Sequence, residues 1–141
     1  MRFQNYQLYY ECQLVALWNA ARFHKIKVPK IGGAQYRKIC YESKAILGGC
    51  INIERERKRL GLVFMPGRID LRWIRKNLPV HLAVFCHKGY HSVLVVDVDA
   101  DDIITLVNYV KGTIFHIKWN SLKDKINKHS KPYSIVPVKQ C

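Results

Sequence analysis

The stretch YHSVLVVDVDADDIITLVN, residues 90–108, decides the fold of this chain. It holds two runs rich in Val, Ile and Leu, 92–98 and 103–107, separated by an Asp-rich turn at 100–102. Short β-branched runs bounded by turn residues are typical of strands, and a short turn joins strands that pair antiparallel. The stretch therefore predicts a β-hairpin.

The rest of the chain divides into a helical first half and a strand-rich second half. In the first half, apolar residues such as Leu14, Leu17 and Trp18 recur at steps of three and four, which is typical of a buried helical stripe. The predicted helices are 12–23, 34–47, 50–60, 70–77 and 121–128, and the further strands are 80–86, 113–117 and 133–138. Helices followed by an antiparallel sheet predict an α+β fold, in a single domain over residues 1–141.

The composition excludes several classes of protein. With 141 residues, 49% of them hydrophobic, the chain is too apolar for disorder and long enough to bury a core. No apolar run reaches the ~18–20 residues that cross a bilayer, and the amino end lacks the apolar core of a secretory signal. We therefore expect a cytoplasmic protein without a membrane span.

The formal net charge of +14, from 24 Lys and Arg against 10 Asp and Glu, favours anionic partners. The basic residues are spread along the whole chain, and no helix-turn-helix or zinc-finger motif contains them. Three interpretations remain: attraction to an acidic protein, binding of a nucleic acid, and charges that simply solvate the surface. We prefer the last.

One cysteine stands apart from the other four. The five are irregularly spaced without a CxxC pair, which argues against a zinc ribbon or a disulfide framework. The histidines do not cluster at metal-ligand spacing either, so we expect neither a metal nor a cofactor. Cys12 begins a predicted helix, where unpaired N–H groups and the helix dipole lower the pKa of a thiol. Cys12 is therefore a candidate nucleophile.

A histidine and an amide lie at matching ends of the predicted hairpin. His91 precedes the run 92–98 and Asn108 follows the run 103–107, so a turn halfway between them places the two opposite each other. An amide beside an imidazole can accept its N–H and orient the ring, which leaves the other ring nitrogen to face a thiol. Cys12, His91 and Asn108 are thus candidate catalytic residues.

Besides the hairpin stretch, four runs carry a family resemblance: YECQLVALWNAARFH (10–24), VHLAVF (80–85), FHIKWNSLKDKI (115–126) and YSIVPV (133–138). They resemble the papain-like cysteine peptidases, most closely the bacteriocin-processing, double-glycine branch, over nearly the whole chain. The resemblance implies N-terminal helices packed on a C-terminal antiparallel sheet. It also implies cleavage of a peptide or isopeptide bond in a peptide or protein substrate, with Cys12 as nucleophile, His91 as general base and acid, and Asn108 as the orienting residue.

The family's oxyanion glutamine stands six residues before the cysteine, where this chain has Tyr6. Gln7, one position later, is the first candidate for that role, and Gln4 is the second. A displaced oxyanion donor leaves two alternatives to a peptidase. One is a catalytically weak or inactive papain-like module that binds protein or nucleic acid through its basic surface. The other is an amidase or acyltransferase that uses the same triad.

Other notable residues are expected to be structural. Cys86 and His87 are adjacent, but neighbouring strand residues point to opposite faces, so Cys86 is expected to be a core thiol. Gly48-Gly49 is expected to end a helix rather than to be a cleavage signal. The histidines expected to be at the surface or partly buried are His24, His81, His116 and His129.

Overall fold

The computed structural model describes residues 3–4, 12–47, 53–86, 89–110 and 113–140. The α-helices are α1 (Cys12–Phe23), α2 (Ala34–Leu47), α3 (Glu54–Arg59), α4 (Leu71–Lys76) and α5 (Trp119–Leu122). The strands are β1 (Leu62–Pro66), β2 (Val80–Cys86), β3 (Gly89–Val98), β4 (Ile103–Val110), β5 (Thr113–Lys118) and β6 (Tyr133–Pro137). Two 3₁₀ turns, η1 (Lys123–Lys125) and η2 (Val138–Gln140), follow α5 and β6.

These strands form one antiparallel sheet in the order β1-β6-β2-β3-β4-β5. β2 to β5 follow one another as neighbours, whereas β6 returns from the end of the chain to lie between β1 and β2. The predicted α+β class and the predicted hairpin are confirmed. Asp99 stabilises the hairpin turn, because its Oδ1 accepts hydrogen bonds from the N–H groups of Asp101 and Ile103, each at 2.9 Å.

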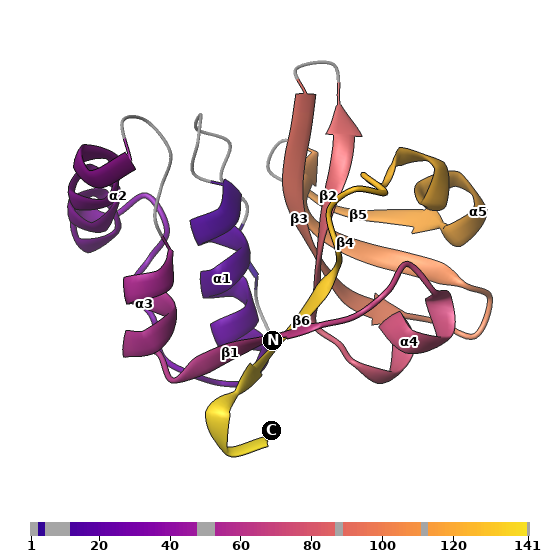
Figure 1. Cartoon of the computed structure of the whole chain (residues 1–141), viewed down its shortest axis with the longest axis horizontal. Helices are drawn as coiled ribbons and strands as arrows, with labels where there is room; N and C mark the ends of the chain where they lie inside the picture. Colours follow the sequence, from indigo (N-terminus) through magenta and orange to yellow (C-terminus); the bar gives the residue numbers. More distant parts are fainter. Residues whose placement is uncertain (1–2, 5–11, 48–52, 87–88, 111–112, 141) are drawn as a thin grey trace.

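Helices cover both faces of the sheet (Figure 1). α1 packs on one face, where Leu17 and Trp18 join Leu94 and Ile135 in one apolar cluster. α4 and α5 cover the other face, where Ile74 and Leu122 pack on the strands. Among the helices of the described ranges, none combines the length and the apolar character needed to cross a bilayer.

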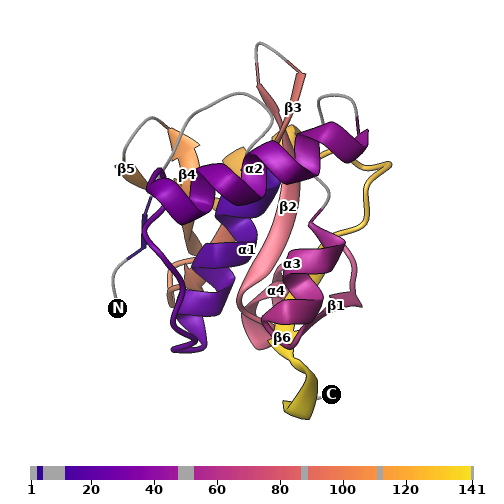
Figure 2. The same ribbon diagram turned by 90° about the vertical axis from the view of Figure 1, so that its left-hand side faces the viewer.

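α1 is enclosed more completely than a single apolar stripe predicts. All residues from 14 to 21 are buried, because α2 crosses the outer side of α1 (Figure 2). There Trp18 meets Tyr36 of α2 edge to face, with ring centroids 5.4 Å apart. A helix that is apolar all round is typical of such a buried position, and it gives Cys12 a rigid support.

Several boundaries differ from the predicted ones. β1 was not among the predicted strands; it is a five-residue edge strand that ends in Pro66 and follows Gly61, whose φ of +68° turns the chain out of α3. The predicted helix 121–128 is instead a short helix that begins at Trp119 and continues into η1, without a side-chain cap. Gly48-Gly49 lies outside the described residues.

Candidate active site

Cys12 is the first residue of α1 and is only half-buried. The N–H groups of the first turn of a helix have no partner within the helix, so they favour an anion at this position. Because α1 is held between α2 and the sheet, the thiol occupies a fixed position at the end of the helix. A thiolate here is both supported and accessible.

β3 supplies the contacts of the Cys12 thiol. The thiol forms hydrogen bonds with the His91 side chain and with the main chain and hydroxyl of Ser92. The register of β3 with β4 ends at the pair Leu94–Val107, so Ser92 is beyond the paired part of that edge. Burial raises the pKa of Cys12, but the hydrogen bonds with His91 and Ser92 and the charge of His91 outweigh it, and the pKa is lowered overall.

The pKa of His91 is shifted in the opposite direction, upward. Burial alone lowers the pKa of a histidine, but the hydrogen bond to Cys12, the hydrogen bond to the Asn108 main chain and the thiolate charge raise the pKa of His91 overall. A lowered thiol pKa and a raised imidazole pKa favour the thiolate–imidazolium pair over the neutral pair. His91 is also half-buried, so the pair is open to a substrate.

Asn108 contacts His91 through its main chain. The carbonyl oxygen of Asn108 lies within hydrogen-bond distance of His91 Nε2. A carbonyl can only accept, so Nε2 carries the hydrogen, and Nδ1 is the ring nitrogen that remains for the thiol. The side chain of Asn108 is fully buried. The third member of the constellation therefore orients the imidazole by a different atom from the amide that the sequence suggested.

The local backbone explains this contact. Asn108 has a φ of +68°, in the left-handed region that asparagine tolerates better than most residues. The pairing of β4 with β5 shifts register between Leu106 and Val110, around the same residue. His91 and Asn108 lie at the same end of the hairpin, as predicted, but they are not register partners, because both lie beyond the last β3–β4 pair. The irregular β4 backbone brings the carbonyl to the imidazole instead.

The structure describes only one of the two glutamines that were predicted as oxyanion donors. Gln7 lies outside the described residues, so its role stays a prediction. Gln4 does not reach Cys12: its main chain pairs with the Asn19 side chain, at 2.9 and 2.7 Å, and its Oε1 accepts a hydrogen bond from the N–H of Ile31. Asn19 is two turns along α1 from Cys12. Gln4 therefore anchors the amino end of the chain to α1 and is not an oxyanion donor.

Sequence reasoning missed two groups near the site. Ser92 carries no motif, although strand alternation places it on the face toward α1. His81 was predicted to be at the surface or partly buried, and that was wrong, since it is 5% exposed. Its ring stacks on Tyr133, with centroids 4.4 Å apart, and neither ring nitrogen has a hydrogen-bond partner among the described residues.

The pKa values of this stacked pair follow from their surroundings. Burial, together with the charge of His91, lowers the pKa of His81 to about 4. Burial, and the nearby charges of Cys12 and Glu54, raise the pKa of Tyr133. Both side chains therefore stay neutral at pH 7 and form an uncharged layer beside the Cys12–His91 pair.

In the part of the chain that the structure describes, the remaining cysteines and histidines form no second site. Cys40 is buried in α2, and Cys86 lies in β2; Cys50, His87 and Cys141 are outside the described residues. His24 Nε2 lies 2.7 Å from the Ile135 carbonyl. Within the described ranges, no three His, Cys, Asp or Glu side chains are grouped so that they could hold a metal ion.

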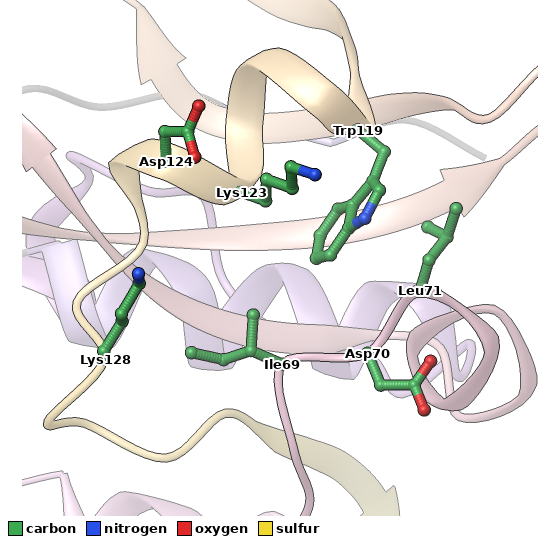
Figure 3. Close-up of a pocket in the computed structure, with 7 residues that line it drawn as sticks. All are labelled: Ile69, Asp70, Leu71, Trp119, Lys123, Asp124 and Lys128. Carbon is green, nitrogen blue, oxygen red and sulfur yellow. The ribbon is translucent and has the colours of Figure 1, made fainter.

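A surface cavity of about 690 Å³ lies elsewhere, between α4 and the segment from α5 onward (Figure 3). Trp119, Lys123 and Lys128 line it together with Asp70 and Asp124. Its acidic and basic groups are mixed, and none of the candidate catalytic residues borders it. The cavity is thus separate from the Cys12–His91 pair.

Comparison with known proteins finds no matching family model and no matching curated protein.

Proposed function

We propose that this chain is a papain-like cysteine peptidase in which Cys12, His91 and Asn108 cleave a peptide or isopeptide bond. The observation that carries the proposal is the contact between the Cys12 thiol, at the first residue of α1, and an imidazole whose Nε2 faces the Asn108 carbonyl. A nucleophile, a base and an orienting group in series are the arrangement that nucleophilic catalysis requires.

In this mechanism the Cys12 thiolate attacks the carbonyl carbon of the scissile bond, and a C–S bond forms. The imidazolium of His91 gives its proton to the leaving nitrogen as the C–N bond breaks. His91 then takes a proton from water, the hydroxide adds to the thioester, and the C–S bond breaks to return the thiolate. The N–H of Cys12 is one donor for the oxyanion, and Gln7 remains the candidate for the second.

The proposal extends to location and partners. A nucleophilic thiol persists best in a reducing compartment, so we place the enzyme in the cytoplasm. Its substrate is a peptide or protein segment, and the net charge of +14 favours one with acidic residues.

The test is selective alkylation of the folded protein. Limiting iodoacetamide is applied between pH 4 and 9, and a peptide map locates the adduct. We expect Cys12 to react below pH 7, because its pKa is lowered, and to require a pH near the ordinary thiol pKa of ~8.5 once His91→Ala removes the imidazole. His116→Ala, which removes an exposed histidine, is the matched control and should leave the profile unchanged.

Two outcomes contradict the proposal. Cys12 could react no faster at pH 6 than an unstructured thiol such as glutathione, or the His91→Ala variant could keep the wild-type profile. Either result means that the two side chains do not form an ion pair.

Two alternatives use the same fold. An amidase or acyltransferase would keep the dependence on Cys12, but an added amine would replace water as the acceptor. A binding module would act through exposed basic residues, such as Arg72, Arg75 and Lys76 of α4, toward an acidic protein or a nucleic acid. Only the binding module would be indifferent to Cys12→Ala.

A further inference from the structure

Two exposed aromatic side chains lie next to the turn of the β2–β3 hairpin, and one of them, Tyr90, is the residue before His91. Phe85 of β2 and Tyr90 of β3 are register partners. Their rings meet edge to face with centroids 5.1 Å apart, and they are 57% and 55% exposed. Figure 1 shows this hairpin extending past the end of α1 at which Cys12 lies.

Strand alternation fixes the face of the hairpin on which these rings lie. Leu94 packs with α1, and Ser92 and Tyr90 follow it at steps of two, so all three belong to the face toward α1. Both His91 and Ser92 contact the Cys12 thiol. Tyr90 therefore shares its face of β3 with Ser92 and lies two residues, or about 7 Å, farther along the strand.

Other large exposed apolar residues in the described part of the chain are scattered over other elements. They are Tyr41, Met65, Ile114 and Val138. Single exposed apolar residues are ordinary, whereas two exposed aromatic rings in contact, one of them on the residue before His91, form a surface that a ligand can cover.

We propose that Phe85 and Tyr90 form a substrate subsite that binds an aromatic or branched aliphatic side chain of an acidic peptide segment. The inference rests on the proposed function and specifies its substrate class. An apolar side chain within about 7 Å of the attacked carbon reaches the two rings, since a peptide in extended form advances about 3.4 Å per residue. The acidic character follows from charge complementarity with a chain of net charge +14.

Electrophilic probes test the subsite without a known substrate. Iodoacetyl-Phe amide and iodoacetyl-Ser amide carry the same reactive group and differ only in the side chain offered to the rings. The ratio of their rates at Cys12 is divided by the ratio for glutathione, which has no subsite. We expect wild-type protein to favour the Phe probe about tenfold or more, because burying an aromatic side chain supplies at least that factor.

Variants assign the preference to the two rings. Tyr90→Thr and Phe85→Thr keep a strand-forming residue, and each should lower the preference to under about threefold. Val138→Thr replaces a residue of similar exposure, 54%, on η2, and should keep the wild-type ratio. Plain iodoacetamide should react equally with all of these proteins, which separates subsite binding from thiol reactivity.

A second pair of probes, iodoacetyl-Phe-Glu-Glu and iodoacetyl-Phe-Lys-Lys amides, tests the charge of the segment. The acidic probe should react at least threefold faster at low salt, and the difference should shrink in 0.5 M NaCl.

The outcomes are distinguishable from failure of the proposed function. If plain iodoacetamide labels Cys12 selectively but the corrected Phe-to-Ser ratio is near one, or stays high in Tyr90→Thr, the subsite is wrong and the nucleophile stands. A faster lysine probe would overturn the acidic class. If plain iodoacetamide shows no selective labelling of Cys12, the peptidase proposal itself fails.

Discussion

Asn108 has a left-handed backbone conformation, and its carbonyl is directed at the His91 imidazole. If the carbonyl is the orienting group, the side chain can be removed as long as the backbone conformation is allowed. The amide side chain, which the sequence suggested as the orienting group, makes a different prediction for the same substitutions.

We expect Asn108→Gly to keep the low-pH reactivity of Cys12, because glycine adopts a φ of +68° without cost. Asn108→Ala should be about 1–2 kcal/mol less stable than Asn108→Gly and should lose part of that reactivity, since alanine strains the turn. Alkylation profiles and urea unfolding of both variants check this. If the two variants lose the reactivity of Cys12 to the same extent, the orienting group is instead the amide side chain, which both variants lack.

His81 should make the stability of the protein depend on pH. Its pKa is about 4 in the folded chain and near 6.5 in the unfolded chain, so between these values only the unfolded chain takes up the proton. The free energy of unfolding should therefore fall as the pH drops from about 6.5 to 4, by at most ~1.4 kcal/mol per pH unit.

The variant His81→Phe keeps a ring to stack on Tyr133, and its free energy of unfolding should not show the fall at low pH that His81 causes. Urea unfolding at pH 7, 6 and 5 measures the difference between the two proteins, which should grow toward low pH. The raised pKa of His91 has the opposite effect on the free energy of unfolding. It stabilises the fold at low pH, and this stabilisation is lost as the pH rises. His91 is present in both proteins, so its contribution largely cancels. His129→Gln, at an exposed position, should run parallel to wild type.

At the scale of elements, α1 depends on a buried polar residue. Asn19 is fully buried, and its side chain donates to the Gln4 carbonyl and accepts from the Gln4 N–H. Asn19→Ala removes both bonds and leaves two main-chain groups without them. We expect a loss of about 2–4 kcal/mol in urea unfolding, compared with less than about 0.5 kcal/mol for the exposed Gln13→Ala on the same helix.

The elements with strong periodicity were predictable. The helices at 12–23 and 34–47 have the predicted bounds, and the hairpin around residues 100–102 forms as expected. β1 was missed because its residues, Leu62–Pro66, are an apolar run without alternation that includes a proline, which argues against a strand. Its pairing with β6 comes from tertiary packing, which no local pattern encodes.

The sequence predicted that Cys12, His91 and Asn108 lie together, but it did not predict the atoms through which they make contact. Position at a helix start and beside a strand singled out Cys12 and His91. The atom that Asn108 offers depends on a register shift and a left-handed φ, and both are consequences of how β4 meets its two neighbours. The burial of His81 likewise depends on which strand face α1 covers.

At the scale of the whole molecule, the net charge of +14 opposes compaction through self-repulsion. Added salt screens that repulsion, with a Debye length that falls from about 30 Å at 0.01 M to about 8 Å at 0.15 M. We expect the melting temperature to rise by a few degrees between these salt concentrations. Scanning calorimetry measures it, and a melting temperature that falls with salt would mean that ion pairs such as Arg75–Asp102 outweigh the repulsion.

The position of β6 in the sheet affects the order in which the sheet can form during synthesis. β6 separates β1 from β2, and Leu62 and Pro137, which pair across β1 and β6, are 75 residues apart in the chain. At about 5–20 residues per second, a ribosome completes β1 several seconds before it supplies this partner. Tyr133, which stacks on His81, also arrives with β6. The growing polypeptide thus carries Cys12 and α1 for most of its synthesis without the strand that joins β1 to the rest of the sheet.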